Sequence, residues 1–473
     1  MRGIAGGVPA LGLLLVLSTC QLTARPEGAR EQGAARFAVD LARRTREVLG
    51  STAAPLSFAH CLEAALEHNL ELRSEAVLAQ LARERTGREL LALLPSLPVR
   101  LEGSYRNRKP YTRSTYLLGR GGLRDSYATA AEKDHFFLVA GLAWSPLDFG
   151  LSFYTACQER LAESTRETVH RRVAQKVAGT LFTAWCHLLA ARRADPLLAR
   201  AREEAQGRVD QAERLRRRRE GTALDMSPLL EELARRQDAA GRNREVRLRA
   251  KAVLAENMGI DPRADLRVER GLLHRAPPLP PLAELIGRSL ISRPELHGAD
   301  LERERAKLEI RKAWLGFFPN VQLFHEFNHD DNEHLLYDDF YRVGARLTGD
   351  LLRIVAAPSL IREARLGRDL VENELHLVSL NILVQVRLAR LDLARALEQD
   401  ALARRELAAA ERAAELEARA AAGRAAGTER RRTRIELLAA RAAALAARRD
   451  AWSAYGELLV AVGDTSPLLG AAR

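Results

Sequence analysis

The sequence is poor in aromatic residues and in lysine, and beyond its first twenty residues it contains no long apolar run. Aromatic side chains make up 5% of the 473 residues, and only six of the 74 basic residues are lysine. Ala, Leu, Arg and Glu dominate instead, a composition typical of long or coiled helices rather than of a β-sandwich or an α/β enzyme. Since no later window offers about 18 apolar residues, the sequence predicts no transmembrane helix.

Cysteine is also scarce, and the charges are interspersed. The four cysteines form neither a CxxC pair nor a Cys/His pattern at metal spacing, so they indicate neither a disulfide framework nor a zinc site. The net charge of +12 arises from arginine and glutamate mixed along the same stretches. Such a distribution is typical of a solvated helix surface, and we expect no nucleic-acid partner.

The first twenty residues have the pattern of an export signal. Met1-Arg2 precedes an apolar stretch too short to span a bilayer, so residues 1–20 are predicted to be a signal peptide. The stretch ends in Leu17-Ser18-Thr19-Cys20, which resembles a bacterial lipobox with Thr in place of the usual Gly, Ala or Ser. We expect cleavage to leave an acylated Cys20, and the alternative is ordinary cleavage after Ala24. Residues 21–55 form an N-terminal extension.

The chain then contains one unit twice. Glu71 and Pro95 in the first copy, and Glu295 and Pro319 in the second, are separated by the same interval. In each copy a helical stretch stops at the proline and a segment with a period of two residues follows. The predicted boundaries are 56–270 for the first repeat, 271–281 for a Pro-rich linker, 282–465 for the second repeat and 466–473 for a C-terminal tail.

Each repeat carries two predicted strands. Alternating apolar residues place them at about 97–105 and 136–145 in the first copy, and at about 321–328 and 340–348 in the second. Each strand has about the length that a tilted membrane strand needs. Four strands cannot close a barrel, because roughly eight are required, so an oligomer is implied. We interpret 106–135 as a polar loop with glycine turns.

Long helical runs follow both pairs of strands. They cover about 150–210 and 352–411, and each would be roughly 90 Å long if continuous. Both are expected to turn back at their far ends, near 209–215 and 408–416. Breaks at 221–228 and 423–428 are expected to interrupt the return runs. Pro196 is expected to kink or break the first run.

This order of elements resembles the TolC family of outer-membrane efflux proteins. The likeness rests on the duplication, on Trp144-Ser145-Pro146-Leu147-Asp148-Phe149-Gly150 after the second strand, and on Leu254-Ala255-Glu256-Asn257-Met258-Gly259 at the end of the first copy. It implies a mostly α fold with a small β part. Long antiparallel helices would form a periplasmic α-barrel, and three chains would each give four strands to one transmembrane β-barrel of twelve strands.

The resemblance implies a passive exit duct, not an enzyme. It implies a homotrimer in the outer membrane of a Gram-negative-type bacterium, in contact with outer-membrane lipid. A periplasmic adaptor and an inner-membrane pump of the RND, ABC or MFS type would be its partners. We expect no catalytic residue, no cofactor and no resident metal. An extracytoplasmic coiled-coil scaffold or adhesin stalk is the alternative, although it gives no reason for duplicated strand pairs.

One motif points to a different chemistry. His325-Glu326-Phe327-Asn328-His329 matches the HExxH signature of zinc hydrolases, which requires both His on one helical turn. Here the motif falls in a predicted strand, where the two His would lie about 13 Å apart, so a zinc hydrolase is a minor alternative. The following run 329–334, with Asp338 and Asp339, could hold a divalent cation but is more simply interpreted as a solvated loop.

The resemblance also implies a gate at the far ends of the helices. In the family this end closes like an iris and commonly carries a ring of acidic side chains. The matching tip residues here are Asp210, Glu213, Arg214, Glu411, Arg412 and Glu415. The alternative is that they form ordinary surface pairs within a helix, worth about 0.2–0.5 kcal/mol each.

Overall fold

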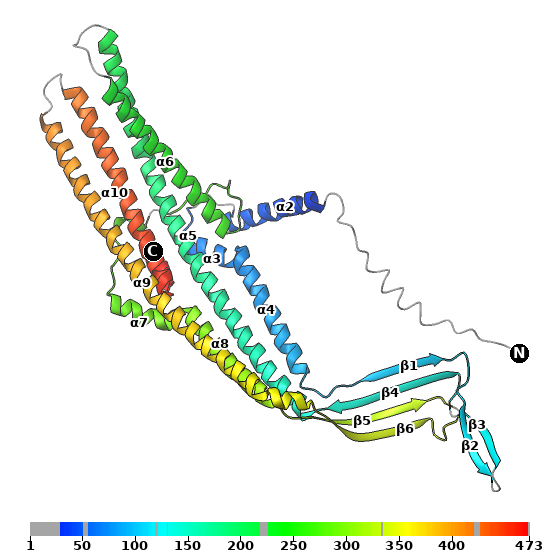
Figure 1. Cartoon of the computed structure of the whole chain (residues 1–473). Helices are drawn as coiled ribbons and strands as arrows, with labels where there is room; N and C mark the ends of the chain where they lie inside the picture. The colour runs from blue at the N-terminus through cyan, green and yellow to red at the C-terminus, as the bar shows by residue number, and fades with distance from the viewer. Residues whose placement is uncertain are drawn as a thin grey trace.

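The computed structural model describes residues 29–50, 55–118, 122–129, 131–217, 226–269, 271–332, 334–420 and 426–471. These residues form a long, narrow molecule with a helical body at one end and strands at the other (Figure 1). None of the helices in these ranges is apolar enough along 18 residues to cross a membrane. The predicted signal peptide 1–20 and Cys20 lie outside the described residues.

Four antiparallel strands form one sheet, in the order β1-β4-β5-β6. They are β1 (Val99–Tyr105), β4 (Asp134–Trp144), β5 (Asn320–Asp330) and β6 (Asp339–Thr348). The two copies of the repeat meet where β4 pairs with β5, with Ala140 opposite Phe327. The outermost strands, β1 and β6, therefore form the two edges of the sheet.

The alternation of side chains gives this sheet two unlike faces. The pairing places Leu138 and Phe327 on one face, which is mainly apolar. On the other face Arg342 forms an ion pair with Glu326, and its guanidinium carbon lies 5.6 Å from the ring centroid of Phe324. The sheet is therefore amphipathic across its thickness.

A second hairpin lies in the segment that the sequence analysis interprets as a loop. β2 (Thr112–Leu118) pairs with β3 (Gly122–Ala128), and Thr115 Oγ1 donates a hydrogen bond to Asp125 Oδ1 over 3.1 Å. The loop interpretation is therefore wrong for these residues. Exposed side chains occur on both faces, Thr112 among them, so the sequence has no apolar alternation to reveal the strands. Gly119 and Gly121 lie outside the described residues.

The helical body combines two very long helices with four shorter ones. They are α5 (Pro146–Arg217) and α9 (Leu351–Ala420), with α4 (Leu70–Leu91), α6 (Ser227–Asn257), α8 (Pro294–Leu315) and α10 (Ala426–Val462). Nearer the strands, α4 packs on α5, and α8 contacts both α5 and α9 (Figure 1). Farther away α6 replaces α4, and α10 replaces α8. The body is thus a layer of antiparallel helices along its whole length.

Short helices lie outside this layer. They are α2 (Ala29–Leu49), α3 (Phe58–His68), the 3-10 turn η1 (Leu272–His274), α7 (Leu282–Ser292) and α11 (Ser466–Ala471). Phe58 of α3 packs on Phe182 and Trp185 of α5, with ring centroids 5.3 and 5.8 Å apart. Phe182 also meets Trp452 of α10 at 6.4 Å. The main hydrophobic core therefore lies between the short helices and one face of the layer.

Both copies of the repeat end in the same way. Gly259 follows α6 with a φ of 64°, and Gly463 follows α10 with a φ of 83°, conformations that favour glycine. A Cβ at Gly259 would lie 2.7 Å from the carbonyl oxygen of His68, and one at Gly463 would lie 3.1 Å from that of Ser292. Each copy thus closes onto the end of its own short helix, and the duplication in the sequence is also a duplication in packing.

The long helices extend beyond the turns that the sequence predicts. α5 contains 72 residues and α9 contains 70, so 209–215 and 408–416 are helical and the predicted turns there are wrong. Helix α6 begins at Ser227 and α10 at Ala426, both inside the interruptions expected at 221–228 and 423–428. Residues 218–225 and 421–425 lie outside the described residues.

The sequence predicts that Pro196 kinks or breaks α5, but the helix continues through this residue without a break. Its ring nitrogen cannot donate to the preceding turn, but tertiary contacts surround it. Ala194 and Leu198 are buried in a cluster shared with α10, and Asp195 accepts a hydrogen bond from Asn243 Nδ2 of α6 over 2.6 Å. Packing against both neighbours therefore holds the helix continuous at the proline.

Candidate functional site

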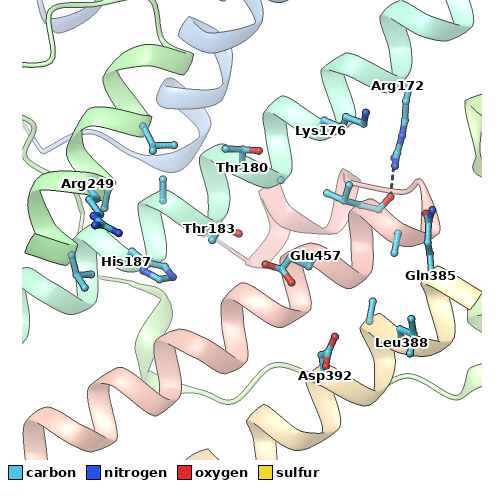
Figure 2. A pocket seen from close by; sticks show the side chains of 18 residues that line it. Arg172, Lys176, Thr180, Thr183, His187, Arg249, Gln385, Leu388, Asp392 and Glu457 are labelled. Carbon is cyan, nitrogen blue, oxygen red and sulfur yellow. Dashed lines mark hydrogen bonds between the residues drawn. The ribbon is translucent and has the colours of Figure 1, made fainter. Parts of the chain in front are cut away.

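The face of the helical layer opposite the short helices is hollowed by a cavity of about 890 Å³. Side chains from α5, α6, α9 and α10 line it (Figure 2). The polar α5 side chains that line it recur at intervals of three or four residues: Arg172, Lys176, Thr180, Thr183 and His187. They share one face of α5, whereas Phe182 and Trp185 lie in the core on the other.

Two glycines let α5 and α10 approach closely beside this cavity. A Cβ at Gly179 would lie 2.2 Å from Val460 Cγ2, and one at Gly456 would lie 2.7 Å from Phe182 Cδ1. Any larger residue would push α10 away from α5. Because Gly179 and Val460 both line the cavity, the absence of a side chain at Gly179 sets the shape of the cavity wall.

Arginines and one glutamate form the first charged region. Arg172 Nε lies 2.6 Å from Glu295 Oε1, and Arg293 Nη1 donates to the same oxygen over 2.8 Å. Arg293 Nη2 donates to Gln385 Oε1 of α9 over 2.6 Å. Burial lowers the pKa of both arginines, and in Arg293 the nearby Arg172 charge adds to this effect. One carboxylate thus joins the junction of α7 and α8 to α5, beside a surplus of positive charge.

The second charged region contains Asp392, Glu457 and His187 (Figure 2). Burial raises the pKa of Glu457, and the negative charge of Asp392 raises it further. Burial lowers the pKa of His187 to about 4, with a further contribution from the Arg449 charge. At neutral pH the imidazole is therefore uncharged, so this region carries acidic charge close to the basic one.

The predicted tip residues all lie in the last turns of the long helices. Asp210 accepts a hydrogen bond from Gln206 Nε2 over 2.9 Å, and Glu213 lies 3.9 Å from Arg217. Glu415 accepts from Arg419 over 2.6 Å. These contacts stay within one helix, as the surface-pair alternative predicts. Arg214 and Arg412 lie on the same stretches of α5 and α9.

Glu411 behaves differently, because it joins two helices. Its Oε1 accepts a hydrogen bond from Arg441 Nη2 of α10 over 3.2 Å, and both side chains are about half exposed. Other links between helices near the tip involve residues that the sequence analysis missed. Glu204 of α5 accepts from Arg434 of α10 over 3.2 Å, and no spacing rule along the chain could reveal a pair so distant in sequence.

The structure separates the residues of the HExxH motif. His325 and His329 lie on strand β5 with Glu326 between them on the opposite face. The ring of His325 stacks on that of Tyr341 at 5.8 Å, whereas His329 Nδ1 lies 2.8 Å from Asp339 Oδ1. Because the motif lies on a strand and not on a helix, the two imidazoles do not share one helical turn, as a zinc hydrolase requires. The strand predicted for this segment is confirmed.

The three described cysteines, Cys61, Cys157 and Cys186, are free thiols. Burial raises the pKa of Cys61 to about 12 and also raises that of Cys186, so both stay protonated. Within the described ranges the cavity brings no nucleophile into hydrogen-bond contact with a general base. Its charges lie along an open face, an arrangement suited to attracting and passing a solute.

Comparison with solved structures finds close matches of fold at low sequence identity. The chain is similar to the CmeC outer membrane channel of Campylobacter jejuni, with a TM-score of 0.69 and 14% identity over 86% of each chain. It is also similar to the MtrE outer membrane channel of Neisseria gonorrhoeae, with a TM-score of 0.67 and 16% identity over 86% of this chain and 89% of MtrE. For the VceC outer membrane protein of Vibrio cholerae the TM-score is 0.65 and the identity 16%, over 86% of this chain and 96% of VceC. No family model and no curated protein sequence matches the chain.

Proposed function

This chain has the fold of the TolC-family outer-membrane channels, as its sequence predicts, and we propose that it works as the exit channel of an efflux or secretion system. The observation that carries the proposal is an amphipathic four-stranded sheet, open at both edges, attached to a helical layer with one uncovered face. Neither feature is complete in one chain. Both become complete if copies of the chain join side by side around an axis.

The edges of the sheet support a homotrimer. β1 and β6 present unpaired backbone groups, which favour pairing with another strand. Leu101 on β1 and Val343 on β6 are 65% and 73% exposed in the single chain. If β6 of one copy pairs with β1 of the next, three copies supply twelve strands, enough to close a barrel.

The helical layer has an uncovered edge as well. Exposed apolar residues on α9 recur at three, four or seven residues and form one stripe: Leu366, Leu370, Leu377, Leu380, Val384, Leu388 and Leu391. An apolar stripe of this period is the surface by which a helix packs on a partner. We assign that partner to the opposite edge of the next copy, where Val77 and Leu81 of α4 are exposed.

In such a trimer the uncovered face would line the lumen. The cavity beside Arg172, Asp392 and Glu457 would then be part of the conduit wall at mid-length. In the sheet, the face with Glu326 and Arg342 would point inward and the apolar face would meet outer-membrane lipid, as in other membrane barrels. Conduction through this lumen would be passive, with the energy supplied by a partner protein.

The far ends of α5 and α9 would lie in the periplasm and meet the partners. We propose a periplasmic adaptor there and an inner-membrane pump of the RND, ABC or MFS type as the source of energy. The tip residues would ring the opening of the trimer and form the gate. The protein would thus reside in the outer membrane of a Gram-negative-type bacterium, where an acylated Cys20 would add an anchor.

Membrane fractionation of the full chain tests this function together with a matched pair of variants. Wild type should sediment with the outer membrane and run as a trimer. Leu380→Asp places a charge on the α9 stripe and should yield monomer, whereas Arg368→Asp places the same side chain on a partly exposed position outside the stripe and should leave the trimer intact. Recovery of wild type as a soluble periplasmic monomer would instead favour a scaffold or stalk.

A further inference from the structure

Strand β4 begins and strand β5 ends at the end of the sheet farthest from the helices (Figure 1). One imidazole and two carboxylates converge there. His135 is the second residue of β4, Asp330 is the last residue of β5, and Asp331 follows it. One possible ligand atom from each residue lies within 4.8 Å of the other two. The closest pair is His135 Nε2 and Asp330 Oδ1, at 2.9 Å.

Backbone hydrogen bonds hold these side chains in place. The amide of Asp331 donates to the carbonyl oxygen of Phe136 over 3.1 Å, and the amide of Phe136 donates to Asp331 Oδ1 over 2.6 Å. The amide of Asp330 donates to the carbonyl oxygen of Asp338 over 2.9 Å. The two aspartates are therefore fixed by contacts with β4 on one side and with the approach to β6 on the other.

The charge of the cluster is uncompensated by fixed cations. Among the described residues, no Arg or Lys forms an ion pair with Asp330, Asp331 or Asp338. Carboxylates held this close repel one another unless a cation lies between them. Backbone amides donate to both carboxylates, that of Asn332 to Asp330 and that of Phe136 to Asp331. These amides carry no net charge, and a single positive ion coordinated by all three groups would balance the negative charge of both aspartates.

We propose that His135, Asp330 and Asp331 bind a divalent transition-metal ion of the Zn²⁺ class. Imidazole nitrogen and carboxylate oxygen are both ligands of zinc, and three protein ligands leave a fourth position for water. Calcium and magnesium take oxygen ligands, so the imidazole selects against them. The ion would join the strand pair of the first copy to that of the second at the outer rim. This site shares no residue with the HExxH motif. His135 and Asp330 lie on the same face of the sheet as Glu326, so in the proposed trimer the ion would lie at the outer mouth of the conduit.

Zinc titration of the full chain in detergent tests the site, using protein stripped with chelator and carrying no histidine tag. Wild type should bind one Zn²⁺ per chain in isothermal titration calorimetry and show much weaker binding of Ca²⁺. His135→Gln and Asp331→Asn should each weaken zinc binding by more than roughly tenfold, since even the outer-shell partners of a metal ligand are worth that much. In Asp331→Asn the amide oxygen can still accept from Phe136, so the backbone contact is kept.

His329→Gln is the matched control, because it removes a neighbouring imidazole that pairs with Asp339 instead. It should bind zinc as wild type does. Circular dichroism verifies that each variant keeps its helices. The proposal is overturned if wild type binds zinc no more tightly than the His135→Gln and Asp331→Asn double variant, or if the His329 variant loses binding equally. Because none of these readouts needs conductance, they are separable from the test of the channel.

Discussion

Arg448 Nε donates a hydrogen bond to Asp400 Oδ1 over 2.8 Å, and this pair is enclosed between α9 and α10. The side chains of Arg448 and Asp400 are only 7% and 2% exposed. Arg404, one turn farther along α9, also donates to the Asp400 carboxylate. A buried charge without its partner destabilises the folded chain, so this pair fixes the register of α9 relative to α10 between the cavity and the tip.

Replacing Asp400 by Ala should therefore destabilise the α9–α10 hairpin by about 3–5 kcal/mol. Glu411→Ala removes a pair between the same two helices that is half exposed, and should cost no more than about 1 kcal/mol. Chemical denaturation gives the change in the free energy of unfolding, and hydrogen exchange locates it in α9 and α10. Equal costs for the two substitutions would show that the buried pair does not hold the helices together.

The pKa of His187 predicts a loss of stability in mild acid. In the folded chain it is lowered to about 4, whereas its ordinary value is 6.5. Between these values the unfolded chain binds the extra proton, so the free energy of unfolding should fall as the pH falls from about 6.5 to 4. The loss should not exceed about 3.5 kcal/mol, because one pKa unit corresponds to about 1.4 kcal/mol.

His187→Gln should remove that part of the pH dependence in thermal unfolding. His376→Gln, which removes an exposed imidazole from α9, should leave the profile as it is in wild type. Glu457 acts in the opposite direction. Its raised pKa gives stability that is present below about pH 4.5 and lost as the pH rises through the folded-state value, so the comparison is sharpest in a Glu457→Gln background.

The proposed gate predicts two separable phenotypes in planar bilayers. Carboxylates converging on a narrow axis favour cations, so Asp210→Ala combined with Glu411→Ala should lower cation selectivity. Arg214→Ala combined with Arg412→Ala should loosen the closed state and raise the leak current. Glu374→Ala, on the exposed surface of α9 far from the tip, is the control. If selectivity and closed-state current are unchanged in both double variants, the tip is not an electrostatic gate.

Mass spectrometry of the mature N-terminus tests the lipid anchor. The run Leu17-Ser18-Thr19-Cys20 predicts that Cys20 is the first residue and carries acyl chains. Mature protein that begins at Arg25 would show ordinary cleavage and remove the anchor. If the wild-type protein begins at an acylated Cys20, the Cys20→Ala variant should carry no acyl chains.

The sequence predicts the strands of the sheet well, because one apolar face makes their alternation visible. Leu138 of β4 and Phe327 of β5 lie on this apolar face, and the alternation within either strand alone is enough to indicate it. The hairpin β2–β3 has exposed side chains on both faces, so no such period exists there. The turns predicted at 209–215 and 408–416 are wrong for a related reason. Arg and Glu favour helix through those residues, and α5 and α9 continue to Arg217 and Ala420.

The contacts that shape the candidate site depend on packing between distant segments. Nothing in the spacing of Asp400 and Arg448, or of Arg172 and Glu295, distinguishes these pairs from the many surface pairs on the same helices. The tip residues, by contrast, could be identified from the resemblance, but their partners could not. Glu411 has a partner on α10, whereas Glu415 has one on its own helix.

Single-channel recording in planar bilayers tests the central claim most directly. Purified full-length chain should insert as trimers and give discrete, long-lived conductance steps, and Leu380→Asp, which should disrupt the trimer, should give none. Arg368→Asp should conduct as wild type does. A wild-type trimer that is stable in detergent and bound to membranes, yet produces no conductance even after the gate substitutions Arg214→Ala and Arg412→Ala, would contradict the proposal that this chain forms a channel.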